Sequence, residues 1–154
     1  MNAYADTNFF TRLYLPLAES EEAWGLLARA QAAASPPLPV TWLHRLETIN
    51  ALQLHVFAGK DRGQARVTLE QAAAAHATFH TDLARPTFLR PVQISPPELE
   101  AQFEELALRH TANNGFRTYD LLHVASALFL RCDTFWSFDP KASRLARLEG
   151  LEIR

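Results

Sequence analysis

Cysteine is nearly absent from this sequence of 154 residues, since Cys132 is the only one. A single thiol forms no internal disulfide and no cysteine-based zinc site, and this usage fits a reducing cytosol. No apolar run reaches the roughly 18 residues that a membrane-spanning helix needs, and the N-terminus has no basic stretch followed by an apolar core. We therefore expect a cytoplasmic protein that makes no membrane contact.

Glycine, lysine and net charge are also in short supply. The five glycines are scattered, so the sequence contains no glycine-rich loop for binding phosphate. Lys60 and Lys141 are the only lysines among 15 basic residues, and the net charge of −2 does not by itself indicate a nucleic-acid-binding protein. Apolar residues make up 48% of the chain and charged residues 21%, as in ordinary globular proteins. We expect residues 1–154 to form a single domain.

Short apolar segments alternate with helical patterns along the whole chain. The predicted strands are Asn2–Ala5, Leu38–Thr41, Thr87–Val92, Thr134–Ser137 and Leu151–Ile153. The predicted helices are Phe9–Leu15, Ser20–Ala34, Trp42–Phe57, Asp61–His80, Ser95–Asn113, Thr118–Arg131 and Pro140–Leu148. This alternation is typical of an α/β sandwich with a mostly parallel central sheet.

The helix predicted over residues 42–57 shows apolar residues at steps of three and four. The pattern consists of Leu43, Leu46, Ile49, Ala51, Leu54 and Phe57, and we expect core packing to account for most of this apolar surface. Gly59 is expected to end this helix. Asp61 followed by Gln64 resembles a capping box that would begin the next one.

Four acids occupy special places in mainly apolar stretches. Asp6 follows the first predicted strand and Asp139 follows the fourth, and functional groups of open parallel sheets gather beyond the carboxyl ends of strands. Asp120 lies in the first turn of a predicted helix, and Glu47 lies inside another. Taken singly, most of these acids have ordinary explanations, such as helix capping for Asp139 or the helix dipole for Asp120. Their joint occurrence favours a functional cluster.

The segments that carry these acids resemble a known family. YADTNFF, LHRLETINAL, RTYDLLHVASAL and SFDP resemble, in order and spacing, the four acidic motifs of PIN-domain ribonucleases. The nearest look-alikes are the VapC-type toxins of bacterial toxin–antitoxin pairs. The resemblance runs from Asn2 to the last predicted strand, and RTYDLLHVASAL is its most specific part. It implies a PIN-like α/β/α sandwich.

The resemblance also implies roles for individual residues. The catalytic and metal-binding acids would be Asp6, Glu47, Asp120 and Asp139. Asn8 and Ser137 match the small polar residues that orient a carboxylate or a bound water, although the usual T-x-D motif is S-F-D here. Arg117 and Arg12 are candidates for contact with phosphate.

Such a cluster has a clear chemical use. Like charges a few ångströms apart raise one another's pKa, so four carboxylates need cations beside them to stay ionised. Oxygen ligands without cysteine select Mg²⁺ or Mn²⁺ over zinc. Family members use these ions to hydrolyse RNA phosphodiester bonds. The VapC resemblance further implies a cognate antitoxin protein and a homodimer.

Rival interpretations exist for the same residues. A catalytically silent module on this fold would bind RNA or a partner without cutting. A haloacid-dehalogenase-like phosphatase would use Asp6 as a nucleophile, but it needs a second aspartate where this chain has Asn8. His76 and His80 have the spacing of zinc ligands but no obvious third ligand, and His123, three residues after Asp120, is expected to be structural.

Overall fold

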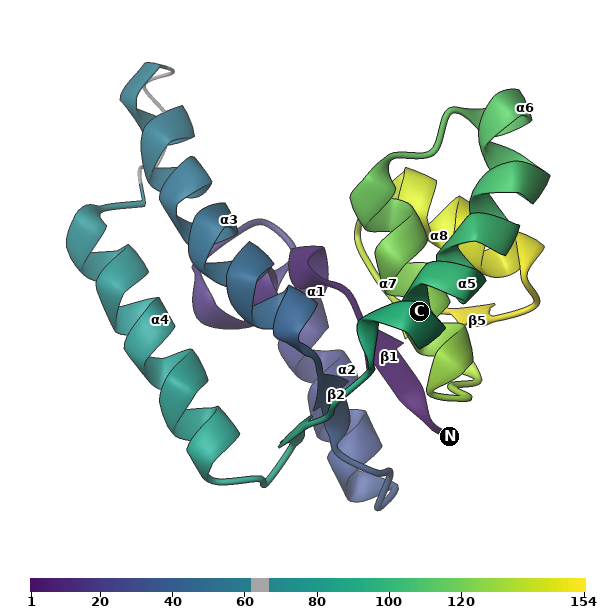
Figure 1. Ribbon diagram of the computed structural model, residues 1–154. Helices are drawn as coiled ribbons and strands as arrows, with labels where there is room; N and C mark the ends of the chain where they lie inside the picture. The colour runs from purple at the N-terminus through teal and green to yellow at the C-terminus, as the bar shows by residue number, and fades with distance from the viewer. Residues whose placement is uncertain (62–66) are drawn as a thin grey trace. The chain divides into compact units, whose positions relative to one another are not determined.

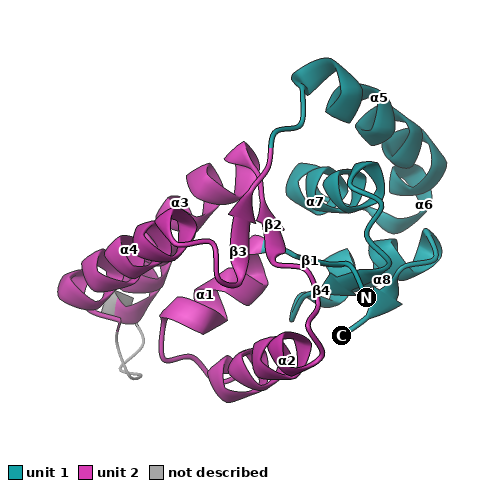
Figure 2. Ribbon diagram, turned by 90° about the horizontal axis from the view of Figure 1, so that it is seen from below, with its two compact units in different colours: residues 1–6, 93–154 teal, residues 7–92 magenta. Residues whose placement is uncertain are grey.

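The computed structural model describes residues 1–61 and 67–154 and divides into two compact units (Figures 1 and 2). Unit 1 comprises residues 1–6 and 93–154, and unit 2 comprises residues 7–92. Each unit contains its own strands and helices. Among the described residues, no helix has the length and apolar character needed to span a membrane.

Unit 1 is built on a three-stranded parallel sheet with the order β1-β4-β5. Its elements are β1 (Ala3–Ala5), α5 (Pro96–Leu106), the π-helical turn η1 (Ala107–Thr111), α6 (Ala112–Asn114), α7 (Thr118–Phe129), β4 (Thr134–Trp136), α8 (Pro140–Leu148) and β5 (Glu152–Ile153). The residues of β1 and β4 are all buried. Both chain ends therefore contribute strands to one sheet, which brings the first residues beside the last third of the sequence.

Tyr4 of β1 packs on the neighbouring strand and also contacts α7. The ring of Tyr4 stacks on Phe135 of the neighbouring strand with a centroid separation of 5.8 Å. The hydroxyl of Tyr4 lies 2.9 Å from Nδ1 of His123, and both side chains are buried. This contact with a core tyrosine of β1 agrees with the structural role expected for His123.

A left-handed residue sets up the start of α7. Gly115 follows α6 with a φ of 64°, a conformation that glycine adopts without steric cost. The chain then extends through Arg117, which precedes α7 with φ −85° and ψ 156°. The predicted end of the preceding helix near residues 113–115 is confirmed. This turn fixes the position of Arg117 and of the first turn of α7.

Unit 2 contains four helices and a parallel pair of short strands within its described residues. Its elements are α1 (Thr7–Tyr14), α2 (Ser20–Ala32), β2 (Leu38–Val40), α3 (Trp42–Asp61), α4 (Leu69–Ala84) and β3 (Leu89–Pro91). β2 pairs with β3 in parallel register. The expectation of parallel strand pairing is thus confirmed, although the strands form two separate sheets rather than one.

The expected buried face of α3 is wrong in part. Leu46, Leu54 and Phe57 are exposed, whereas Leu52 and Val56 are buried. Buried side chains lie at every fourth position of α3, at His44, Thr48, Leu52 and Val56. Two of these residues are polar, so an apolar pattern alone points to the wrong side of the helix.

The predicted boundary between α3 and α4 is also wrong. α3 continues through Gly59 to Asp61, so Asp61 does not begin the next helix. Gln64, the other half of the expected capping box, lies outside the described residues. The capping box of α4 is formed instead by Thr68 and Gln71, whose side chains exchange hydrogen bonds with each other's backbone N–H over 3.1 and 2.9 Å.

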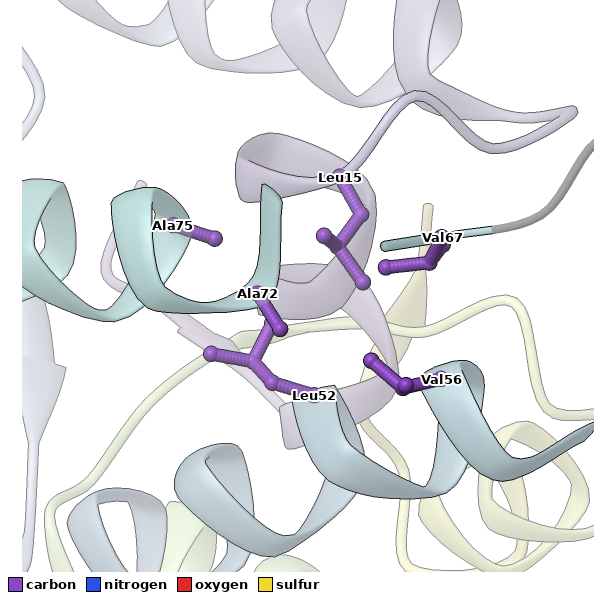
Figure 3. Close-up of a cluster of buried hydrophobic side chains, with 6 residues drawn as sticks. All are labelled: Leu15, Leu52, Val56, Val67, Ala72 and Ala75. Atoms are coloured by element: carbon purple, nitrogen blue, oxygen red, sulfur yellow. The ribbon is translucent and has the colours of Figure 1, made fainter. Parts of the chain in front are cut away.

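A cluster of small and branched side chains joins α3 to α4. Figure 3 shows its members, which are Leu15, Leu52, Val56, Val67, Ala72 and Ala75. Leu15 directly follows α1, so this cluster connects three helices of unit 2. Leu52 is fully buried at its centre.

We expect Leu52→Ala to lower the free energy of unfolding by about 2–5 kcal/mol, because it removes buried methyl groups and leaves a cavity. Leu54→Ala is the matched control on the same helix, since Leu54 is 55% exposed. Its effect should stay within about 0.5 kcal/mol. Urea unfolding of both variants checks this, and equal losses would contradict the packing described for α3.

Candidate active site

The first candidate acid lies where two parallel strands of unit 1 end side by side. β1 and β4 pair with Ala5 opposite Trp136, and the N–H of Asp6 donates to the Trp136 carbonyl over 3.1 Å. The next position along this register sets Asp6 beside Ser137, whose Oγ donates to Asp6 Oδ2 over 2.6 Å. Asp6 is only 4% exposed. A buried carboxylate therefore stands at the sheet edge where α/β proteins gather functional groups.

Asp139 uses its two carboxylate oxygens for different purposes. Oδ1 accepts hydrogen bonds from the N–H groups of Lys141 and Ala142, over 2.7 and 3.4 Å, and so caps α8. Oδ2 accepts from the guanidinium of Arg117 over 2.6 Å. The N–H of Asp139 donates to Ser137 Oγ over 2.9 Å. The capping role considered from the sequence is therefore real, and it leaves one oxygen for another partner.

The ionised form of Asp139 is favoured by this environment. Burial raises the pKa of its carboxyl. The hydrogen bonds from Arg117 and from the backbone of α8 act in the opposite direction and outweigh burial, so the pKa lies below its ordinary value.

Arg117 and Asp120 are joined by several hydrogen bonds at the start of α7. The Nη2 and Nε groups of Arg117 donate to Oδ1 and Oδ2 of Asp120 over 2.8 and 2.9 Å. The backbone N–H of Arg117 also donates to Asp120 Oδ2 over 3.1 Å. The side chain of Asp120 is 6% exposed and that of Arg117 is 58% exposed. The pKa of Arg117 is raised above its ordinary value, chiefly by the hydrogen bond to Asp120, so its guanidinium stays protonated.

Hydrogen bonds connect the three predicted aspartates of unit 1 in a continuous chain. Ser137 joins Asp6 to Asp139, and Arg117 joins Asp139 to Asp120. Lys141 adds a second basic group at this edge, where its Nζ donates to the carbonyl of Gly115 over 3.2 Å. Shared hydrogen-bonding partners thus link Asp6, Asp139 and Asp120, three of the four acids that the sequence singled out, and their role as one site stays a prediction.

The other predicted site residues belong to unit 2. Glu47 lies on α3, and its Oε2 accepts a hydrogen bond from Thr7 Oγ1 over 2.7 Å. Asn8 lies in the first turn of α1. Arg12 forms an ion pair with Glu19, with Nε to Oε2 at 3.0 Å. The convergence of Glu47 with the three aspartates stays a prediction, as do the roles expected for Asn8 and Arg12.

The donor chemistry of this edge fits a hard divalent cation. Asp6, Asp120 and Asp139 offer carboxylate oxygens only, which suit Mg²⁺ or Mn²⁺. As they stand, no three histidine, cysteine or acidic side chains in residues 1–61 and 67–154 form a group that could hold a metal ion. Between Asp120 and Asp139, the bridging positive group is the guanidinium of Arg117. A metal ion between these two carboxylates would have to replace that guanidinium.

One polar residue in each unit contacts a predicted site acid but was not singled out from the sequence. Thr7 donates to Glu47, and Lys141 lies in the first turn of α8 with its N–H on Asp139. Thr7 was visible only as the middle of the D-T-N motif. Lys141 could have been singled out from the sequence, because it stands two positions after a candidate metal-binding acid and a basic side chain there could contact phosphate.

The rival constellations have ordinary structural explanations. His76 and His80 bring their Nε2 atoms to 3.0 Å on an exposed face of α4, but they supply only two ligands. The thiol of Cys132 is buried, which disfavours reactivity.

Comparison with known proteins supports the fold that this geometry indicates. The sequence matches no protein-family model and no curated protein. Solved structures do match. VapC20 of Mycobacterium tuberculosis, a toxin that cleaves the sarcin–ricin loop, is 20% identical with a TM-score of 0.63, over 92% of this chain and 93% of that one.

A second similar structure comes from the VapBC2 complex of Rickettsia felis, solved with a DNA fragment from their promoter. It is 14% identical with a TM-score of 0.66, and the match covers 100% of this chain and 98% of that chain. Both matches span nearly the whole of each chain. The protein therefore has the PIN-like α/β/α fold of VapC structures, as its motifs predict.

Proposed function

We propose that this protein is a metal-dependent endoribonuclease and the toxin of a toxin–antitoxin pair. The observation that carries the proposal is the hydrogen-bonded chain from Asp6 through Ser137, Asp139 and Arg117 to Asp120. This chain lies at the carboxyl edge of β1 and β4, in a protein with the fold of VapC structures. Asp6 and Asp120 are buried and Asp139 is partly exposed, and carboxylates linked in this way gain nothing from one another's charge, because like charges repel.

The proposed roles follow from the contacts of each side chain. Asp6, Asp120 and Asp139 would hold Mg²⁺ or Mn²⁺. Glu47 is proposed as a fourth ligand because its motif resembles that of PIN-domain ribonucleases. A bound divalent ion supplies a water of lowered pKa and neutralises charge that develops on the phosphate. Ser137 orients the Asp6 carboxylate through its 2.6 Å hydrogen bond. Asp139 is held by the backbone of α8, which limits its motion during catalysis.

The proposed partners are RNA and an antitoxin protein. The similar toxin VapC20 cleaves the sarcin–ricin loop, so that loop is the first RNA to test. The similarity to a structure of the VapBC2 complex supports an antitoxin protein as a partner. The exposed Leu46, Leu54 and Phe57 of α3 support a protein partner for unit 2, since exposed apolar side chains that share a helix favour association. Homodimer formation is part of the same proposal.

The main test is cleavage of total RNA and of a sarcin–ricin loop oligonucleotide with Mg²⁺, with Mn²⁺ or with EDTA. We expect the wild-type chain to cut only with metal. Asp6→Asn and Asp120→Asn should lose at least about a hundredfold in rate, because each removes one negative ligand charge. Ser137→Ala should lose about 10–100-fold, since it only orients Asp6.

Glu104→Gln is the control, because Glu104 is an exposed acid on α5 outside the hydrogen-bonded chain. It should cut at the wild-type rate. Cleavage in EDTA, or equal rates for Asp6→Asn and Glu104→Gln, would contradict the mechanism. Binding without cutting would favour the silent module. Release of inorganic phosphate from a monoester would favour the phosphatase.

Two substitutions at Asp139 should separate its capping role from its charge. Asp139→Asn keeps an amide oxygen that caps α8 nearly as well as a carboxylate, whereas Asp139→Ala removes the cap and costs about 0.5–2 kcal/mol. We expect both variants to lose RNA cleavage, and Asp139→Ala to unfold at a lower urea concentration than Asp139→Asn, because both lose the charge but only Asp139→Ala loses the cap. An active Asp139→Asn enzyme would show that the charge of Asp139 is dispensable.

The lowered pKa of Asp139 also predicts how stability depends on pH. A carboxyl whose pKa is lower in the folded state stabilises the fold above its ordinary pKa, near 3.8. This contribution is lost as the pH falls through the lower folded-state value. The difference in unfolding free energy between the wild type and Asp139→Asn should therefore be constant near neutral pH and shrink below about pH 4. A difference that grows in acid would contradict the direction of the shift.

A further inference from the structure

The position of Arg117 suggests a function beyond contact with phosphate. Its Nη2 atom lies 2.8 Å from Asp120 Oδ1 and 2.6 Å from Asp139 Oδ2, so one nitrogen bridges two carboxylates that are 19 positions apart in the sequence. A cation between two carboxylates is the arrangement that a divalent ion would also adopt. In this structure, the guanidinium supplies the positive charge at that place.

The two acids are fixed, whereas Arg117 has room to move. Asp120 is 6% exposed within the first turn of α7, and Asp139 Oδ1 is held by the backbone of α8. The side chain of Arg117 is 58% exposed, so its guanidinium faces water on one side. Its backbone is fixed beside Asp120 by the 3.1 Å hydrogen bond of its own N–H. Outward movement of this exposed side chain would leave the backbone hydrogen bond between Arg117 and Asp120 in place.

We propose that Arg117 is an exchangeable internal cation, which bridges Asp120 and Asp139 in the metal-free protein and is displaced when a divalent ion binds. The inference rests on the proposed metal-dependent function. In the metal-free protein, Arg117 offsets the repulsion between the two carboxylates and keeps them in place. After displacement, its guanidinium remains tethered at the edge of the site, where it can bind an RNA phosphate. Arg117 is thus a positioning residue that lowers the affinity of Asp120 and Asp139 for a divalent ion and stabilises the metal-free protein.

Arg109 offers a matched control within the same unit. Its Nη1 donates to both carboxylate oxygens of Glu149 over 2.8 and 2.9 Å, its side chain is 54% exposed and its partner is 10% exposed. Glu149 follows the C-terminal end of α8, whereas Asp139 precedes its N-terminal end. Removal of Arg109 breaks a similar ion pair at the opposite end of the same helix.

The test measures Mn²⁺ binding to the full-length chain by electron paramagnetic resonance of the free ion, at neutral pH and without RNA. We expect Arg117→Gln to bind Mn²⁺ roughly two- to fivefold more tightly than the wild type, the range for displacement of a half-exposed ion pair. Arg117→Lys keeps the charge but loses the planar fork, and should lie between them. Arg109→Gln should bind Mn²⁺ as the wild type does.

Thermal unfolding in EDTA supplies the second measurement. Arg117→Gln should have a lower Tm than the wild type in EDTA, and saturating Mn²⁺ should raise its Tm by more than it raises the wild-type Tm. Damage to the fold alone would weaken Mn²⁺ binding. Tighter binding by a variant with a lower Tm in EDTA is therefore specific to competition between Arg117 and the ion.

The possible failures are distinguishable. Equal or weaker Mn²⁺ binding by Arg117→Gln, with metal-dependent RNA cleavage by the wild type intact, would overturn the exchange and leave the proposed function standing. Absence of Mn²⁺ binding in every variant would overturn both the exchange and the proposed metal site. Tighter binding by Arg109→Gln as well would show a general charge effect and would also overturn the exchange.

Discussion

Repulsion among buried carboxylates is the constraint on which the organisation of unit 1 depends. Asp6 and Asp120 are almost fully buried, and each stays favourable only where donors or cations face it. Asp6 accepts a hydrogen bond from the hydroxyl of Ser137, and Asp120 accepts from the guanidinium of Arg117. Asp139 accepts from a backbone N–H group at the start of α8. Each donor is aimed at a particular oxygen, so the acids have defined orientations rather than a diffuse negative field.

The backbone produces this arrangement through the ends of its regular elements. Two parallel strands end at the same edge, which sets Asp6 beside Ser137. Two helices begin at this edge: Asp139 accepts hydrogen bonds from N–H groups in the first turn of α8, and Asp120, in the first turn of α7, accepts from the N–H of Arg117 just before that helix. The positive ends of both helix dipoles favour these negative charges. The same features stabilise anionic side chains and would favour an anionic substrate once cations are added. Stability and proposed function therefore draw on the same few groups.

Several parts of the fold could be predicted because they depend on local sequence. The strand predicted over Asn2–Ala5 forms over Ala3–Ala5, and the helical stretch predicted over Ser95–Asn113 begins at Pro96 and ends at Asn114, because both depend on signals within a few residues. The buried face of α3 was missed because it is not purely apolar. His44 is fully buried there with its Nδ1 accepting from the N–H of Thr41, and such local satisfaction of a polar group is invisible to a hydrophobic pattern.

The sequence by itself determined which acids stand at strand and helix ends, because strand alternation and helix-start signals are properties of short segments. It also determined the likeness to a nuclease family through the order of its motifs. Only the tertiary structure decided which side chains form hydrogen bonds with these acids. The hydrogen bond of Ser137 to Asp6 spans 131 positions, and that of Arg117 to Asp139 spans 22. The physical reason is that a hydrogen bond requires its two atoms to lie about 3 Å apart, and for residues so distant in sequence that distance follows from strand register and helix packing rather than from local periodicity.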